Sequence, residues 1–364
     1  QEIYCPNPDC PNHKNPPLEA EWYRKKGFAN TKRSGNTQRY QCKLCKRTFA
    51  LSYFSINHYV HRKIPVRKLL YHLVSGSGIR DMSRAMHCHP CVIQHRIREL
   101  SRRIMAVCSQ ETALLELNED VAADGLENFI LSQYFPTYLN ILVGHDSQFI
   151  YTFNSYHFKR KGSMTEEQRK IKEKIYKEAQ FEKGAASERF REILDFLALK
   201  AKESERSSFI LDTDENPIYH TQISRHPDIR DKISHRKTNS KKARNYQNKL
   251  FPCNYIDRQI RKDLAEYIRE TVQFGRDMNN CMDRFTCYSF WHNFCKPFRI
   301  NPGKEKYKYH AQVAGFTIRS ITEIVSEVFS GIRKQDDVAC EYLTDFQRRH
   351  WERNLINPLA RKAV

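Results

Sequence analysis

The chain has 364 residues and a formal net charge of +20, from 62 Lys and Arg residues against 42 Asp and Glu residues. This length predicts two or three domains, and the 40% hydrophobic and 12% aromatic content excludes a disordered basic tail. Such a positive excess on a folded chain indicates a polyanionic partner, most often nucleic acid, although some folded proteins are merely basic.

The sequence has no apolar run of about 18 residues, so we expect no membrane span. We also expect no secretion signal, because no cationic and apolar leader opens the sequence. Four of the 12 cysteines have metal-binding spacing, and the others are scattered. This pattern favours a reducing, cytoplasmic setting over a disulfide framework.

Residues 1–55 predict a zinc ribbon. The stretches "CPNPDC" and "YQCKLCKRTF" each carry a cysteine pair, and two pairs on two turns can place four thiolates around one Zn²⁺ ion. A segment this short needs a structural metal to fold. Two disulfides or free thiols are the alternatives, and His13 could replace one cysteine. The predicted zinc ligands are Cys5, Cys10, Cys42 and Cys45.

Residues 62–112 predict a helix-turn-helix domain. Apolar residues recur at helical spacing in three segments, with Gly76 and Gly78 ending the first and Pro90 beginning the third. We expect the third helix to enter the DNA major groove. The alternative is a three-helix linker domain. Cys88 and Cys91 are interpreted as core thiols. The residues expected to face DNA are His89, Gln94, His95 and Arg96.

Residues 118–300 predict a mixed α/β domain. The runs "EDVAADGLENFI", "TYLNILVGH", "SQFIYTFNSY" and "SSFILDTD" are typical of strands, with a hairpin turn at 145–147. Between the third and fourth strands we expect a charged helical insertion at about 160–204. Residues 225–249 predict an irregular basic loop, followed by a helix that begins near Asp257.

Three carboxylates stand at the ends of these predicted elements. Asp124 ends the first strand, Asp214 ends the fourth, and Asp257 opens the helix. If the first and fourth strands are neighbours, these side chains can converge into an oxygen site for divalent metal. Two Mg²⁺ or Mn²⁺ ions there would hold the attacking and leaving oxygens of a phosphodiester. The alternative is ordinary turn aspartates.

Three stretches over about residues 118–320 resemble bacterial insertion-sequence transposases of the DDE type. They are "DGLENFILSQYFP", "DTDENPIY" and "NYIDRQIRKDLAEYIRETVQFGR". The second is similar to a Thr-Asp-x-x-Pro-x-Tyr block, which implies Asp214 rather than Asp212 as the second acid. The third implies Asp257, with Asp263 as runner-up. Many family members have Glu as the third acid, so Glu266 and Glu270 are further alternatives.

The resemblance implies an RNase H-like catalytic core at 118–300, joined to an N-terminal zinc ribbon and helix-turn-helix domain. A helical C-terminal region at 301–364 would follow, where Phe346 and Trp351 suggest docking or dimerisation. The implied activity is metal-dependent cleavage at insertion-sequence ends and strand transfer into target DNA. The implied location is the bacterial cytoplasm, at the nucleoid.

The expected partners are double-stranded DNA, from element ends and target, and further copies of the chain in a homodimer or larger assembly. A non-enzymatic DNA-binding regulator, derived from a transposase, and a divalent-metal nuclease without strand transfer are the alternatives. His235 is interpreted as a surface residue. The residues expected to bind DNA phosphates are Arg236, Lys237, Lys241, Lys242, Arg258, Arg261 and Lys262.

Overall fold

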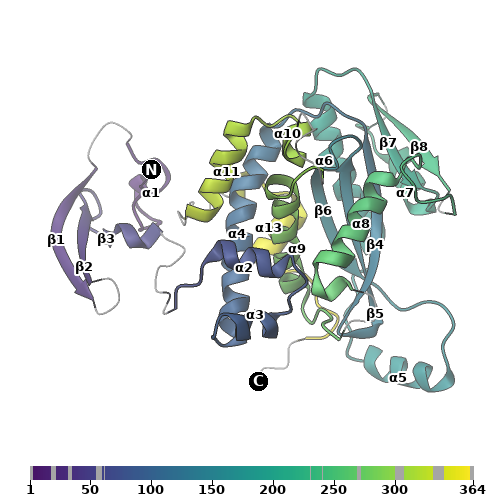
Figure 1. Cartoon of the computed structure of the whole chain (residues 1–364), viewed down its shortest axis with the longest axis horizontal. Helices are drawn as coiled ribbons and strands as arrows, with labels where there is room; N and C mark the ends of the chain where they lie inside the picture. Colours follow the sequence, from purple (N-terminus) through teal and green to yellow (C-terminus); the bar gives the residue numbers. More distant parts are fainter. Residues whose placement is uncertain are drawn as a thin grey trace.

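The computed structural model describes residues 3–17, 22–31, 35–54, 60, 62–229, 231–239, 241–268, 272–299, 307–330 and 340–360. The fold is mixed α/β, as the sequence predicts, with a cysteine cluster near the N-terminus. Its buried apolar residues form two main clusters, one between Tyr4 and Phe54 and one between Ile64 and Leu355. Figure 1 shows the helices gathered around the larger of two sheets. No helix in the described ranges is both long enough and apolar enough to cross a bilayer.

The N-terminal cluster is built on a small antiparallel sheet. Buried aromatic residues, among them Trp22, Phe49 and Phe54, pack beside the cysteines, and Trp22 stacks on Phe49 with ring centroids 5.7 Å apart. So few apolar residues give a small core, which is the usual reason for a structural metal. The elements are α1 (Pro11–Lys14), β1 (Tyr23–Thr31), β2 (Gly35–Cys42), β3 (Thr48–Ala50) and η1 (Leu51–Phe54).

The three helices predicted at 62–112 are present, and the third is long. Pro90 occupies the first turn of that helix, where its missing N–H costs nothing, and His89 caps it. The far half of the helix packs against α9 and α11, so Ile104 and Val107 belong to the same hydrophobic cluster as the large sheet. The helices are α2 (Val66–Leu73), α3 (Ile79–Ala85) and α4 (Pro90–Leu114).

The large sheet has the strand order β6-β5-β4-β7-β8. Strand β5 is antiparallel to both of its neighbours, whereas β4, β7 and β8 are parallel. The first strand therefore lies beside the fourth, which is the condition for the predicted acids to meet. The strands are β4 (Val121–Ile130), β5 (Ser132–Gly144), β6 (Ile150–His157), β7 (Phe209–Asp214) and β8 (Ile233–Thr238).

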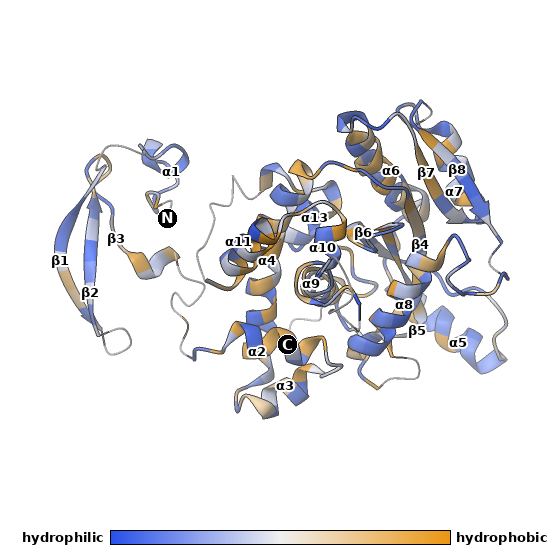
Figure 2. Cartoon of the chain, turned by 45° about the horizontal axis from the view of Figure 1, so that its top comes forward, coloured by the Kyte–Doolittle hydropathy of each residue, from blue (hydrophilic) through white to orange (hydrophobic). Residues whose placement is uncertain are grey.

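One expectation about this region is wrong, and another is met in two parts. Strand β8 lies within 225–249, which the sequence predicts to be irregular, because Ile233 and Thr238 bury their side chains while charged residues between them hide the strand signal. The predicted insertion at 160–204 divides into two different helices. Helix α6 (Ala185–Glu203) packs on β5 and β6, and α5 (Glu166–Tyr176) buries none of its residues. Figure 1 shows α5 projecting from the molecule, and Figure 2 shows it as largely hydrophilic.

The C-terminal helices pack on the rest of the chain. Phe346 and Trp351 are buried, and the Arg102 guanidinium lies 4.1 Å from the Trp351 ring centroid. The aromatic residues expected to mediate docking or dimerisation thus contact this chain. The remaining elements are α7 (Pro217–Arg225), α8 (Phe251–Asp263), η2 (Ala265–Tyr267), α9 (Met278–Phe290), the π-helical turn η3 (Trp291–Cys295), α10 (His310–Val313), α11 (Ile318–Ser330) and α13 (Asp345–Trp351).

Candidate active site and metal centre

The four predicted zinc ligands lie together. The Sγ atoms of Cys5, Cys10, Cys42 and Cys45 are all within 4.8 Å of one another. The Cys5–Cys45 and Cys10–Cys42 Sγ separations are 3.4 and 3.8 Å, close to the roughly 3.8 Å between thiolates around a tetrahedral zinc. These separations also exclude disulfide bonds, which need about 2.05 Å. The cluster therefore has the donors and the spacing of a structural zinc site.

The surroundings of the cysteines differ, because burial raises the pKa of Cys5 and Cys10 while Cys42 is favoured as thiolate. Burial alone would raise the pKa of Cys42, but hydrogen bonds from the backbone at Cys45 and from the Asn12 side chain lower it to about 7. The His13 ring bonds the backbone oxygen of Cys5. This contact places His13 beside the cluster, and Cys10 holds the ligand position for which His13 was the alternative.

Asp124 and Asp214 stand side by side where two parallel strands separate. The last pair between β4 and β7 is Ala122 with Asp212, and each acid follows two residues later. Asp124 does not end its strand, as the sequence predicts, because β4 continues along β5 to Ile130. Asp124 therefore lies past the last β4–β7 pair and not at a strand end.

Asp257 reaches the same region from α8. The helix begins at Phe251, six residues before the expected start, so Asp257 lies in its middle at helical spacing with the buried Cys253 and Ile260. Helix α8 packs on β4 and β5, which turns this face toward the sheet. The Asp257 Oδ1 atom is buried and has no hydrogen-bond partner. A buried carboxylate oxygen without a partner is unfavourable unless a cation or a ligand completes it.

Electrostatic coupling identifies Asp124 as the central acid. Burial and then the charge of Asp214 raise the pKa of Asp124 to about 6. Burial and then the charge of Asp124 raise the pKa of Asp257 to about 7. The three carboxylates do not form a group within 4.8 Å of one another, a spacing that only the cysteine cluster reaches among the described residues. Their donor chemistry fits divalent cations, which would offset this repulsion.

The competing acids have cationic partners. Asp212 is fully buried, and Arg236 binds both of its oxygens, at 2.6 and 2.8 Å. Glu266 accepts a hydrogen bond from Arg284 at 2.5 Å, and the Asp263 Oδ1 atom lies 3.2 Å from Lys262, although its buried Oδ2 atom has no hydrogen-bond partner. Glu270 lies outside the described residues. Asp124, Asp214 and Asp257 therefore remain the best candidate set.

Two expectations about α4 are corrected, one about a residue predicted to contact DNA and one about a cysteine. Arg96 is only 1% exposed, so the prediction that it faces outward is wrong. It follows Ile93 by three residues and precedes Leu100 by four, which places it on the apolar face. His89 and His95 are exposed, and Gln94 is partly exposed. Cys91 is also exposed, contrary to its interpretation as a core thiol.

The predicted phosphate-binding residues divide into two groups. Arg236 is engaged by Asp212, and Arg261 donates to the backbone oxygens of Glu127 and Tyr267. The sequence interpretation omitted Arg244, whose charge lowers the pKa of both Asp124 and Asp257 and which therefore lies near them. The only feature of the sequence that points to Arg244 is its position in the basic loop at 225–249. The exposed members of the predicted set are Lys237, Lys241, Lys242, Arg258 and Lys262.

Replacing Arg236 with alanine should lower the free energy of unfolding by about 2–4 kcal/mol, because it leaves Asp212 charged and fully buried. The loss should stay below that of a fully buried pair, since the Arg236 side chain is 38% exposed and His145 lies 3.8 Å from Asp212. Urea denaturation measures the change. Lys237→Ala, an exposed neighbour, should change stability by less than about 0.5 kcal/mol. Equal stability of both variants would contradict the structural role of the pair.

Replacing Asp257 with asparagine should stabilise the metal-free protein by roughly 1–3 kcal/mol at pH 8. The raised pKa of Asp257 means that its stabilising contribution is present below about pH 3.8 and lost as the pH rises through about 7. The variant should therefore lose less stability than the wild type between pH 5 and pH 8. Thermal unfolding with and without Mg²⁺ measures this, and Mg²⁺ should stabilise only the wild type. The exposed Glu215→Gln variant should behave as the wild type.

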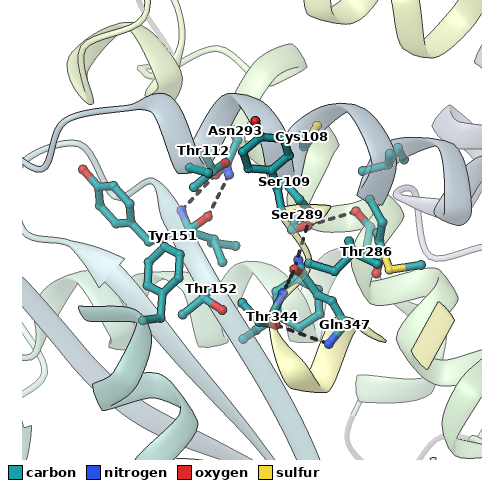
Figure 3. A pocket seen from close by; sticks show the side chains of 18 of the residues that line it. Cys108, Ser109, Thr112, Tyr151, Thr152, Thr286, Ser289, Asn293, Thr344 and Gln347 are labelled. Atoms are coloured by element: carbon teal, nitrogen blue, oxygen red, sulfur yellow. Dashed lines mark hydrogen bonds between the residues drawn. The ribbon is translucent and has the colours of Figure 1, made fainter. Parts of the chain in front are cut away.

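A separate cavity of about 380 Å³ lies among α4, β6, α6, α9 and the segment 341–347. Figure 3 shows polar side chains of its mainly apolar lining, among which Ser109 and Gln347 are joined by a hydrogen bond of 3.4 Å. None of the three candidate acids lines it. The cavity is therefore a feature distinct from the carboxylate site.

A search against protein-family models gives no match for this chain, and neither does a comparison with curated proteins. The function must therefore be argued from the site itself. Its two components are a four-cysteine cluster with zinc geometry and a set of three acids held by β4, β7 and α8.

Proposed function

We propose that the chain is a DDE-type DNA transposase with an RNase H-like catalytic core. The observation that carries the proposal is the position of Asp124. Its carboxylate is coupled to Asp214 on the adjacent strand and to the unpaired carboxylate of Asp257 on the covering helix. A strand, a strand and a helix supplying three acids is the arrangement that the transposase resemblance implies.

The sheet supports the RNase H-like assignment. Such a core requires its first strand beside its fourth, and here β4 pairs with β7 in parallel while β5 and β6 continue the sheet on the other side. Helix α6 connects β6 to β7 and covers the sheet. The strand order supports the proposed RNase H-like fold, whereas the proposed transposase activity is argued from the three acids.

Each group has a defined task in this proposal. Divalent cations held by the three acids would activate the attacking oxygen and offset the charge that develops on the phosphodiester. Asp124 would share cations with Asp214 and with Asp257, and α8 holds Asp257 against the sheet. Arg244 and the exposed lysines Lys241 and Lys242 lie in the loop before α8 and would hold the DNA backbone.

The N-terminal ribbon supports DNA as the partner. Strand β1 exposes Arg24, Lys25 and Lys26, and Arg39 on β2 is also exposed. Cations on a rigid, metal-supported hairpin can contact successive phosphates. The predicted helix-turn-helix adds His89 and His95 on the exposed side of α4.

The test is a plasmid assay with Mg²⁺ and DNA that carries the sequences flanking the reading frame. Joined products support the transposase. Cleavage without joining supports a divalent-metal nuclease, and binding without either reaction supports a DNA-binding regulator. The proposal is rejected if the wild-type protein binds this DNA and neither cleaves nor joins it in Mg²⁺ or Mn²⁺.

A further inference from the structure

Three partly exposed aromatic residues form a continuous surface on β5 and β6. Tyr138 and Tyr156 are paired across the two strands, with ring centroids 5.9 Å apart. Phe158 follows, and its ring centroid lies 6.4 Å from that of Tyr138 and 6.0 Å from that of Tyr156. All three are half-buried. We call Tyr138, Tyr156 and Phe158 the aromatic ledge.

The ledge begins at Gly125, one residue along β4 from the candidate acid Asp124. The Tyr138 ring lies against Gly125, the residue after Asp124, so closely that a Cβ atom added there would come within 1.7 Å of the ring. Glycine at this position lets the ring cover the strand. Burial raises the pKa of the Tyr138 hydroxyl, and the charges of Asp124 and Asp214 raise it further. The charges of both carboxylates thus act on this hydroxyl.

A second tyrosine, the buried Tyr219, belongs to this region. Tyr219, from the block that resembles the transposase motif, is 3% exposed, and its buried hydroxyl lies beside that of Tyr138. Its pKa is raised well above the usual value by burial and then by Tyr138, Asp124 and Asp214. The Tyr219 hydroxyl thus faces the same small region as the inner end of the ledge.

The outer end of the ledge is basic. Lys159 and Lys161 follow Phe158 directly and are exposed, and Arg160 is partly exposed. Partly exposed aromatic rings next to cations are the elements of a site for unpaired nucleotides: bases stack on the rings and phosphates contact the cations. An apolar protein partner would not need this charge, and paired bases could not reach the rings.

We propose that the aromatic ledge stacks an unpaired nucleobase of the DNA strand whose backbone crosses the three acids. The substrate class is therefore DNA with at least one unstacked nucleotide near the reacting phosphate. This inference rests on the proposed function, because it takes the acids as the place where the backbone lies. The stacking is tolerant of sequence, since every base offers a ring face.

The test uses a short single-stranded oligodeoxythymidine that carries one 2-aminopurine, with the full-length protein in the absence of divalent metal. Stacking on the ledge should quench the 2-aminopurine fluorescence. The double variant Tyr156→Leu with Phe158→Leu should weaken binding by about 10- to 100-fold and abolish the quenching. Phe158→Trp should retain both, and so should Tyr71→Leu, which removes a 50%-exposed tyrosine on α2.

The controls separate this inference from the proposed function. Circular dichroism must show that the double variant is folded, and the single variant Phe158→Leu replaces it otherwise. Asp214→Asn should keep the quenching while losing cleavage. A wild-type protein that cleaves DNA but gives no quenching, or quenching equal to that of the leucine variants, overturns the ledge alone. Quenching by a wild-type protein that never cleaves upholds the ledge and rejects the transposase.

Discussion

Replacing Asp124 with asparagine is expected to lower metal-dependent DNA cleavage on the order of a thousand-fold or more. Asp124 is the acid whose charge is coupled to both of the others, so its loss affects every cation that the site can hold. The substituted amide would keep the shape of the side chain and one carbonyl oxygen without the charge. The assay is plasmid cleavage and joining at saturating Mg²⁺.

The matched control is Glu127→Gln, an exposed acid on the same strand. It should keep cleavage within a few-fold of the wild type, because substitutions of exposed side chains outside the acid set usually have small effects. DNA binding by Asp124→Asn, followed by gel shift, should be unchanged or slightly tighter, since a negative charge is removed. Full cleavage activity in Asp124→Asn would refute the assignment of the acids.

Replacing Cys42 with serine is expected to unfold the N-terminal ribbon and release its zinc. Zinc binding in such small modules supplies about 10–16 kcal/mol, and that free energy is the folding free energy of the module. The β1–β3 sheet packs on the cysteines and has few other apolar contacts. Zinc content per chain should fall from about one to near zero, and proteases should cut within residues 3–54 while the larger body stays intact.

Cys91→Ser is the matched control, because Cys91 is exposed and lies far along the sequence from the cluster. Its zinc content and protease pattern should equal those of the wild type. DNA binding should weaken strongly in Cys42→Ser alone, since the basic strand β1 loses its shape. Retained zinc in Cys42→Ser would show that the metal is held elsewhere.

The candidate site residues have local signals in the sequence where their chemistry requires a fixed spacing or an apolar neighbour. The four cysteines have ligand spacing, and Asp214 follows an apolar run inside a motif. Asp124 was also identifiable, but its place inside β4 was not, because the continued pairing with β5 is a long-range contact. The three-helix segment and the hairpin turn near 145–147 followed from periodicity and turn residues.

Other features depend on tertiary contacts. Arg96 looks like a surface residue in the sequence and is buried because α4 packs on both sides, a context that outweighs local pattern. Strand β8 is charged, yet Arg236 lies in it because Asp212 on β7 provides a buried partner. The start of α8 was misplaced because Pro252, at the first turn of a helix, reads equally well as a loop residue.

The length of α4 has a practical and evolutionary consequence. The first turns of α4 carry the exposed residues expected to contact DNA. Its last turns are buried in the hydrophobic cluster that includes the large sheet. If the chain were divided after residue 112, the C-terminal fragment would lose the α4 residues that pack in its hydrophobic core. The two parts therefore cannot be exchanged as independent modules. If the proposed function holds, the DNA-reading and catalytic parts share one helix, and the ribbon, with its own apolar cluster, is the part that can be exchanged.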